Sequence, residues 1–440
     1  MSKKKDSLKP WLSRPAVNRS VTLPLTRPLT QRLSNLNEFH PNELDPYLLF
    51  DARDSMIGTL ENPTLDLDPS TPATLNVITA TRSGTATYTD VNGNIATAAA
   101  DTVRVDHVDG VPMILVEPSS ENLVEYSEDF SDSSWDKQSG GTGVDPVVTP
   151  NSAISPDGTQ NASKVVFNTA GGTTTSDESF LTVGLPTVIG GTYTQSVYLK
   201  GDVGGEQILI RGAGGSAYTT ITLTTDWVRY EGTEVEPNNT DAYLQIGLRQ
   251  GLSGVVINQS TTVYIWGAQF EEGSVATSYI PTSGSTVTRQ ADDLVISGSD
   301  FDFYNQSEGT VYVESELQRA TGPSFVPFLF DADNGDANRV LLYYEPGGIT
   351  GLVRAAGTQN VIDIGTHPAA NTLSRTAFSY KSNNLQGSKD GNSVTPVTTA
   401  TIPTSINRFN VGSHYTKADS YYFNGHLKRL IYWPVSSDSL

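Results

Sequence analysis

Two glutamates separated by one residue form the carboxylate pair best placed for chemistry. In the stretch VYVESELQ, strand alternation puts Tyr312, Glu314 and Glu316 on one face and apolar side chains on the other. Glycoside cleavage needs two carboxyl groups about 5–10 Å apart, and neighbours on one strand face meet that distance. A solvated strand face produces the same pattern without any chemistry. We favour the solvated face and expect no enzyme.

Acidic residues also gather in DADNGD, residues 331–336. Alternating oxygens of this kind wrap Ca²⁺ in an EF-hand loop, but Gly335 stands where Asp or Asn is expected and Leu342 where Glu is needed. The EF-hand hypothesis therefore fails. A looser structural calcium site at Asp331, Asp333 and Asp336 stays open, and the alternative is a polar turn between the strands FVPFLF and RVLLYY. We expect no other cofactor.

Aromatic side chains offer a third chemistry, because the apolar faces of sugars pack on π surfaces. Trp266 lies in an alternating strand with Tyr264 and Phe270 on the same face, and we interpret that face as core. Turn-rich sequence near the C-terminus supplies three candidates for glycan contact: His414, Tyr421 and Tyr422.

Several kinds of active site are excluded by what the sequence lacks. It contains no cysteine, which rules out a disulfide framework, thiolate catalysis, and zinc–thiolate or iron–sulfur sites. It contains no G-x-S-x-G elbow, no G-x-x-x-x-G-K-[ST] loop and no H-E-x-x-H helix. The five histidines are scattered. The sequence therefore offers no standard nucleophile, phosphate site or zinc site.

The charge is strongly acidic and unevenly spread. The 440 residues carry 28 basic and 48 acidic side chains, a formal charge of −20, which argues against nucleic acid as the main ligand. Residues 1–40 hold eight basic and two acidic side chains, so they carry +6 and the other 400 residues carry −26. No apolar run reaches the roughly 18 residues of a membrane helix. The basic start has no apolar segment behind it, so we expect neither membrane insertion nor a signal peptide.

The basic N-terminal stretch is rich in proline, which favours extended backbone. Its leucines have no other obvious place of burial, so residues 1–45 are predicted to form an arm that orders on a partner surface. The alternative is a disordered basic tail. The expected anchoring contacts are Lys3, Lys4, Lys5, Trp11, Arg14, Leu23, Leu25, Arg27, Leu29 and Arg32.

The elements beyond residue 47 are predicted to be short strands. Stretches of Val, Ile, Thr and Tyr alternate with Gly, Asn, Asp and Ser turns every 8–12 residues, which is typical of all-β sandwiches or barrels. No stretch shows a sustained helical period, so we expect little helix. DVNGN predicts a hairpin with a type I′ turn. Expected strands include 85–89, 192–200, 207–211, 262–270, 309–317, 377–380 and 427–433.

Changes in composition divide the chain into four parts. We expect the arm over 1–45, a small β domain over 46–117, and two tandem jelly-roll or β-sandwich domains over 118–290 and 291–440. Acidic residues before a new strand, in RQADDLVISGSD, mark the last boundary.

Several blocks resemble a recurring module of bacteriophage fibre and spike proteins. They are TATYTDVNGNIATAAADTVRVDH (85–107), VPMILVEPSSENLVEYSEDFSDSSW (111–135), NSAISPDGTQNASKVV (151–166), GTYTQSVYLKG (191–201) and VYIWGAQFEEGSVATSYIPTSG (263–284). The segment after residue 118 resembles a carbohydrate-binding jelly roll. Such modules often hold a structural calcium near the chain entry, which makes Glu117, Glu121 and Asp129 a second calcium candidate.

The last segment resembles a concanavalin-A or laminin-G-like sandwich. The matching stretches are SEGTVYVE (307–314), TAFSYKSNNLQGSKDGNSV (376–394) and FNGHLKRLIYWPVSSD (423–438). Glycanases with this fold carry acids at three alternating positions of one strand. Here the third position, Tyr312 or Gln318, is not acidic, which supports the expectation that the chain is not an enzyme.

The bacteriophage resemblance implies a virion structural protein, with a tail fibre favoured over a head fibre. It implies assembly in the host bacterial cytoplasm, attachment to other virion proteins through the arm, a homo-oligomer expected to be a trimer, and contact with host-surface polysaccharide. The alternatives are a secreted or surface glycan-binding, lectin-like protein, and a capsid decoration protein without a receptor role.

Overall fold

The computed structural model describes residues 60, 62–212, 218–236, 242–252, 258–318, 328–438 and 440. The ten expected anchoring residues lie outside the described residues: Lys3, Lys4, Lys5, Trp11, Arg14, Leu23, Leu25, Arg27, Leu29 and Arg32. In the described part, no helix is long and apolar enough to cross a membrane.

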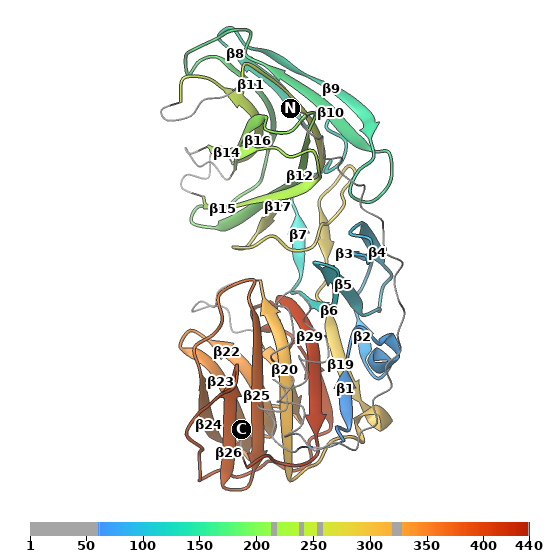
Figure 1. Ribbon diagram of the computed structural model, residues 1–440, viewed down its shortest axis with the longest axis vertical. Helices are drawn as coiled ribbons and strands as arrows, with labels where there is room; N and C mark the ends of the chain where they lie inside the picture. The colour runs from blue at the N-terminus through green and yellow to red at the C-terminus, as the bar shows by residue number, and fades with distance from the viewer. Residues whose placement is uncertain are drawn as a thin grey trace, which may run out of the picture. The chain divides into compact units, whose positions relative to one another are not determined.

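Antiparallel strands make up the described chain, so the all-β prediction is confirmed (Figure 1). The helical elements among the described residues are single short 3₁₀ turns. They are η4 (Pro72–Leu75), η5 (Gly298–Phe301) and η6 (Asp419–Tyr421). The expected strand at 207–211 matches β13 residue for residue, and the others agree within a few residues at each end.

Two sheets form a jelly roll from the middle of the chain. The first has the order β15-β12-β17-β10-β9 and the second β14-β13-β16-β11-β8. Their strands are β8 (Asp136–Gly140), β9 (Val144–Ala153), β10 (Ala162–Asn168), β11 (Glu178–Gly184), β12 (Thr192–Gly201), β13 (Gln207–Arg211), β14 (Thr219–Thr222), β15 (Val228–Val235), β16 (Tyr243–Arg249) and β17 (Ser260–Glu272). Apolar side chains such as Trp135, Phe167 and Phe270 fill the core of this jelly roll.

Two further sheets form a second sandwich, which we call the terminal sandwich. One sheet has the order β27-β26-β25-β20-β29-β6-β5, with β1 also paired to β29, and the other β2-β19-β28-β21-β22-β23-β24. The first contains β1 (Leu65–Leu67), β5 (Arg104–Val108), β6 (Val111–Val116), β20 (Glu308–Leu317), β25 (Leu373–Lys381), β26 (Asn384–Lys389), β27 (Asn392–Ser393) and β29 (Gly425–Trp433). The second contains β2 (Thr79–Thr81), β19 (Asp293–Ser297), β21 (Phe328–Asp333), β22 (Arg339–Glu345), β23 (Gly348–Ala355), β24 (Thr358–Gly365) and β28 (Arg408–Val411).

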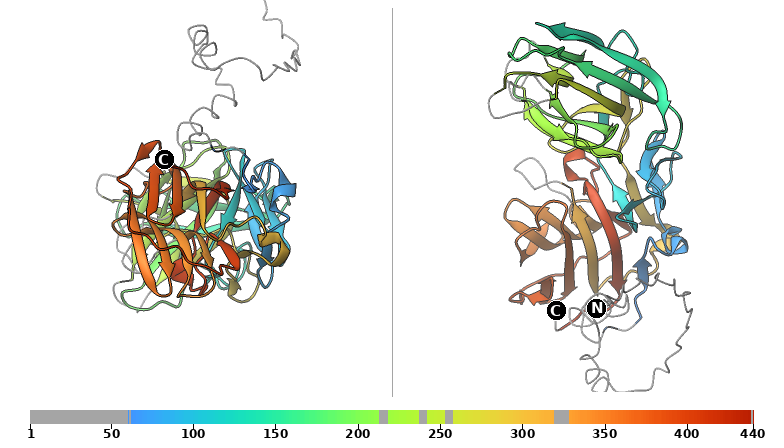
Figure 2. Two further views of the ribbon diagram at one scale, coloured as in Figure 1. Left: turned by 90° about the horizontal axis from the view of Figure 1, so that it is seen from below. Right: turned by 45° about the horizontal axis from the view of Figure 1, so that its top comes forward.

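The jelly roll is inserted within the terminal sandwich rather than placed before it. β1 and β6 pair with β29, and β2 pairs with β19, so strands from before and after the jelly roll share sheets (Figure 2). A short pair, β7 (Ser120–Asn122) with β18 (Val287–Arg289), joins the chain where it enters and leaves the jelly roll.

This topology differs from the small separate domain expected over 46–117. Leu67, Ile114 and Val116 precede the jelly roll in sequence. They are fully buried in the same core as the strands after residue 291. A segment of about 70 residues buries little apolar surface by itself, and adding its strands to a larger sheet solves that problem.

The hairpin predicted at DVNGN is present, but its turn is of another type. β3 (Ala86–Thr89) pairs with β4 (Ile95–Ala98), and the Gly93 amide donates to the Asp90 carbonyl at 3.0 Å. Gly93 has a φ of 82° while Asn92 is not among the residues with positive φ, so this is a three-residue loop rather than type I′. The Asp90 carboxylate accepts the amides of Asn92 and Asn94, which favours this turn.

A β-bulge separates Trp266 from Phe270, which we expected to share a face. The pairing of β12 with β17 shifts between Ser196 and Tyr198, and Gly267 has a φ of 63°. Phe270 therefore points into the jelly-roll core, while Trp266 packs with Tyr279 on the other side of the sheet. Both rings are buried, so burial was predicted correctly and the shared face was wrong.

Candidate functional site

The outward face of the sheet β14-β13-β16-β11-β8 carries a line of polar residues. Cross-strand pairing sets Asp136 opposite Thr182, Thr182 opposite Gln245, and Gln245 opposite Arg211. Paired residues of adjacent strands project to the same side of a sheet. The register alone therefore assembles this line from four strands that are far apart in sequence.

Hydrogen bonds tie most of this line together. The Thr182 hydroxyl donates to the Gln138 carbonyl oxygen Oε1 at 3.0 Å, and Nε2 of Gln245 donates to the Thr182 hydroxyl at 3.2 Å. Gln138 in turn donates from Nε2 to Asp136 at 2.8 Å. We call Asp136, Gln138, Thr182 and Gln245 the polar row. Its amides are held in place before any ligand arrives.

Two tyrosines hold an arginine next to the polar row. The guanidinium carbon of Arg211 lies 4.8 Å from the ring centroid of Tyr218 and 4.5 Å from that of Tyr243. We call these three residues the tyrosine–arginine stack. Phe180 stacks on Tyr218 at 5.6 Å, and the Tyr218 hydroxyl accepts a hydrogen bond from Arg249 at 2.9 Å. Tyr218 is thus held in place by both Phe180 and Arg249.

The polar row, together with Arg211 and Tyr243 of the stack, borders a hollow of about 810 Å³. That volume lies in the range of small-molecule sites, about 300–1,000 Å³. Gly184 stands opposite Tyr243 on the next strand, and a Cβ atom added there would meet nothing within 4 Å. The small residue keeps space open beside the Tyr243 ring.

Besides Oγ of Ser134, two polar atoms at this hollow lack a partner in the described structure. They are Nε of Arg211 and Oε1 of Gln245. Most buried polar atoms in proteins are satisfied, so a donor and an acceptor left over at one hollow suit a ligand with hydroxyl groups. Rings that offer π faces, beside amides in fixed positions, can hold both the apolar face and the hydroxyls of a sugar.

The sequence analysis missed this site although it predicted the strand that carries Arg211. The residues come from β8, β11, β13 and β16, with Tyr218 directly before β14, and only the pairing of these strands brings them together. Alternation of polar and apolar residues in each strand was the available signal. It shows that a face is exposed, without saying which strands are neighbours.

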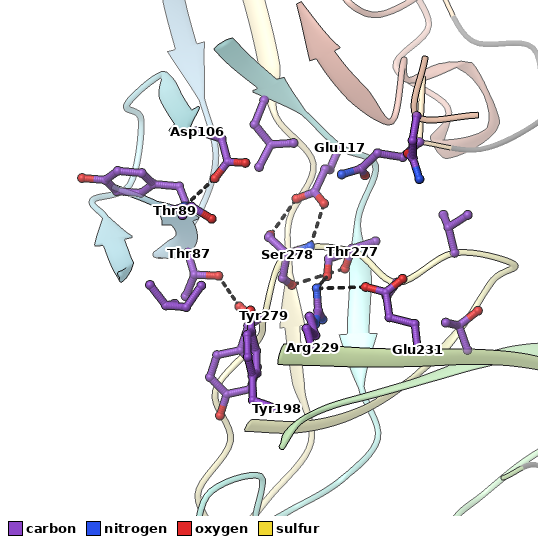
Figure 3. Close-up of a pocket in the computed structure, with 18 of the residues that line it drawn as sticks. Thr87, Thr89, Asp106, Glu117, Tyr198, Arg229, Glu231, Thr277, Ser278 and Tyr279 are labelled. Carbon is purple, nitrogen blue, oxygen red and sulfur yellow. Dashed lines mark hydrogen bonds and ion pairs between the residues drawn. The ribbon is translucent and has the colours of Figure 1, made fainter. Parts of the chain in front are cut away.

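A second hollow, of about 390 Å³, is lined by the β3–β4 hairpin, β15 and residues 274–279 (Figure 3). Its polar groups mostly satisfy one another. Arg229 donates to the Thr277 carbonyl at 2.8 Å and lies 3.8 Å from Glu231, and the Thr87 hydroxyl donates to the Tyr279 carbonyl at 2.5 Å. Among the described lining residues, Nε of Arg229 and Oε1 of Gln318 lack a partner, which is one polar atom fewer than at the sheet face.

A buried charge cluster of Arg82, Arg104, Glu117, Arg289 and Asp292 lies behind this second hollow. Arg82 contacts Asp292 at 2.7 Å, Arg104 contacts Glu117 at 2.7 Å and also pairs with Asp292, and Arg289 lies 3.5 Å from Glu117. Burial raises the pKa of Glu117, but the charges of Arg289 and Arg104 and hydrogen bonds from Ser278 outweigh it and hold that pKa well below its usual range.

The second calcium candidate falls partly in this cluster. Glu117 is occupied by two arginines and by Ser278, whereas Glu121 and Asp129 are exposed. Across the described residues, no group of three or more His, Asp or Glu side chains is arranged to hold a metal ion.

The first calcium candidate is an ion-pair network. Asp331 contacts Arg339 at 2.7 Å, Asp333 contacts Arg408 at 2.7 Å, and the exposed Asp336 contacts Arg354 at 2.5 Å. Burial raises the pKa of Asp331, and Arg339 opposes that shift. Guanidinium groups already contact the carboxylate oxygens that would have to bind a calcium ion.

The structure places the three residues expected to contact glycans in different surroundings. His414 and Tyr421 lie together, with ring centroids 4.8 Å apart, but His414 is largely buried against Phe328. Burial and the charge of Arg339 lower the pKa of His414 to about 3. Tyr422 is 3% exposed and belongs to the core of the terminal sandwich. Glycan contact at these residues stays a prediction.

The strand face of the glutamate pair is covered rather than solvated, so that prediction was wrong. Tyr312 and Glu314 are buried, and Trp433 and Leu440 pack over Tyr312. Glu314 lies 3.1 Å from Lys428 and accepts a hydrogen bond from the Tyr312 hydroxyl at 3.1 Å. Glu314, the buried member of the pair, therefore has partners within the structure.

Comparison with known proteins finds distant structural similarity only. No family model and no curated protein matches the chain. The carbohydrate-binding module CBM40 of the Ruminococcus gnavus IT-sialidase bound to α2,3-sialyllactose is 12% identical, with a TM-score of 0.26 over 30% of this chain and 80% of that chain. A CBM4 structure is 21% identical, with a TM-score of 0.19 over 29% of this chain and 87% of that chain. Domains LG4-5 of the mouse laminin α1 chain are 11% identical, with a TM-score of 0.23 over 57% of this chain and 85% of that chain. The described chain is thus distantly similar to carbohydrate-binding modules and laminin-G-like sandwiches.

Proposed function

We propose that this chain binds glycans through the outward face of the jelly-roll sheet β14-β13-β16-β11-β8, without catalysis. One observation carries the proposal: the polar row borders the same hollow as Arg211 and Tyr243 of the tyrosine–arginine stack. In this proposal the Tyr243 ring packs on the apolar face of a sugar, and Gln138 and Gln245 meet its hydroxyl groups. Fixed side chains lower the entropic cost of binding such a ligand.

A glycan array with the purified full chain tests the proposal, followed by calorimetric titration of the best ligand. Tyr243→Ala removes one packing surface and should weaken binding at least about tenfold, which corresponds to about 1.4 kcal/mol. Gly184→Leu should place an apolar side chain in the hollow and abolish binding, and a Cβ atom added at Gly184 meets nothing within 4 Å.

Gly347→Leu is the matched control, because Gly347 is also exposed and also has nothing within 4 Å of an added Cβ, but lies between β22 and β23 of the terminal sandwich. It should bind like the unaltered chain. A blank array, or unchanged binding by Gly184→Leu with an unchanged melting temperature, would contradict the proposal.

A location on a bacteriophage fibre or spike is a second proposal, and the order of the sequence blocks between residues 85 and 284 supports it. In this proposal, residues 1–45 attach the chain to other virion proteins, a trimer forms, and the glycan site faces the host surface. Deleting residues 1–45 should abolish incorporation into particles and leave glycan binding intact. Normal incorporation of the truncated chain would refute the attachment role.

A further inference from the structure

Arg211 stands apart from the other arginines of the described chain. The guanidinium groups of nine of the eleven described arginines contact a carboxylate, and those of Arg211 and Arg375 are the exceptions. Among the described residues the Arg211 side chain also makes no hydrogen bond, and its Nε atom is buried without a partner. In a chain with a formal charge of −20, a cation without a counterion among the described residues is a feature that needs an explanation.

We propose that the hollow takes glycans that carry a carboxylate, such as those with uronic or sialic acid units, and that Arg211 binds the carboxylate. This inference rests on the proposed glycan-binding function and adds the chemical class of the ligand. A guanidinium group presents its N–H donors in a planar fork that matches a carboxylate, and such charge-assisted pairs are stronger than neutral hydrogen bonds.

The stack prepares Arg211 for this contact. A partly buried cation without a counterion is costly, and the π faces of aromatic rings compensate part of that cost. Tyr218 and Tyr243 both lie within 5 Å of the guanidinium carbon and so restrict the arginine rotamer. The neighbour across the strand is the neutral Gln245 rather than an acid, so nothing in the register neutralises the guanidinium.

The polar row sets the orientation of the bound ligand in the hollow. Asp136 is the acid that borders the same hollow, and it lies three strands away from Arg211 in the register. Adjacent strands are about 4.8 Å apart, so the two charges are separated by roughly 14 Å. The negative end of a ligand should lie at Arg211 and its hydroxyl-rich part should lie along Gln245, Thr182 and Gln138.

The test compares uronic-acid and sialic-acid oligosaccharides with the methyl esters of the same oligosaccharides, titrated into the full chain. Esterification removes the charge and keeps the sugar, so the acid form should bind at least about tenfold more tightly at low salt. Arg211→Gln should bind both forms with equal affinity, and Arg211→Lys should keep part of the preference. Arg375→Gln, which changes the other arginine without an acid partner, should keep all of it.

The outcomes separate this inference from the proposed function. Equal binding of acid and ester by the unaltered chain, binding of neutral glycans alone, or a preference that survives in Arg211→Gln would overturn the role of Arg211 and leave glycan binding standing. Failure to bind any glycan on the array would overturn both.

Discussion

Replacing Glu117 by glutamine should destabilise the protein more than its small change in shape suggests. The substitution keeps the volume and removes one negative charge from the buried charge cluster. Glu117 accepts contacts from Arg104 at 2.7 Å and from Arg289 at 3.5 Å, with the Ser278 amide and hydroxyl each at 2.7 Å. After the substitution, Arg104 keeps Asp292 as a partner, but Arg289 loses its carboxylate contact while it is only 2% exposed.

The expected loss is about 3–5 kcal/mol of unfolding free energy. At 2.7 Å and an effective dielectric constant of about 20, the Arg104–Glu117 attraction is worth about 6 kcal/mol before desolvation is counted. A neutral amide costs less to bury than a carboxylate, which offsets part of the lost attraction. Ser278 can still donate to the amide oxygen. Removing one member of a buried ion pair costs about 3–5 kcal/mol, because the remaining charge stays buried.

Urea unfolding followed by tryptophan fluorescence measures this loss. Glu178→Gln is the matched control, since Glu178 also pairs with an arginine, Arg249 at 3.5 Å, but both side chains are 29% exposed. Such a pair contributes about 0–1 kcal/mol. A loss below about 1 kcal/mol for Glu117→Gln would refute the argument that the cluster depends on charge.

The same substitution should change the response to acid. The folded state holds the pKa of Glu117 below the ordinary value of 4.5. Its contribution to stability is therefore complete above that ordinary value and is lost as the pH falls toward the folded value. Glu117→Gln should show a shallower loss of stability below pH 4.5, and an unchanged acid limb would contradict the ion-pair account.

Two further predictions concern packing and the buried imidazole. Gly247→Ala should lower the free energy of unfolding by about 1–3 kcal/mol, measured by urea unfolding, because the added Cβ would lie 2.2 Å from the Ser179 carbonyl oxygen. An unchanged free energy of unfolding would show that β11 and β16 can separate. His414 has a pKa lowered from 6.5 to about 3, so it favours stability above pH 6.5 and withdraws that contribution as the pH falls toward 3. Its ring resonances should not titrate between pH 7 and pH 5 in NMR spectra, and a midpoint near 6.5 would refute its burial.

Strands could be predicted from sequence because β-branched runs and turn residues act locally. The strand 207–211 was predicted at the observed bounds of β13, and the hairpin at DVNGN was found where Asn-Gly indicated a turn. The turn type was missed because the Asp90 side chain, rather than the Asn-Gly backbone, decides it. Local chemistry therefore predicted elements better than their detailed geometry.

The candidate site could not be predicted because its residues meet only through register. Thr182, Gln245 and Arg211 stand on three strands whose order differs from their order in sequence. The alternation rule also failed at Gly267, where one extra residue moves Trp266 to the face opposite Phe270. A single bulge cannot be read from polarity, because both faces of β17 are buried there.

The insertion of the jelly roll within the terminal sandwich has a consequence for synthesis on the ribosome. All jelly-roll strands, β8 to β17, emerge before most of the terminal sandwich, so this domain can fold while translation continues. β1 and β6, although made early, must wait for their partner β29, which is the last strand in chain order. A nascent chain that stops short of β29 would therefore present a finished jelly roll beside an unpaired β1 and a β5–β6 hairpin with one open edge. Apolar residues of these early strands would be exposed to chaperones and proteases.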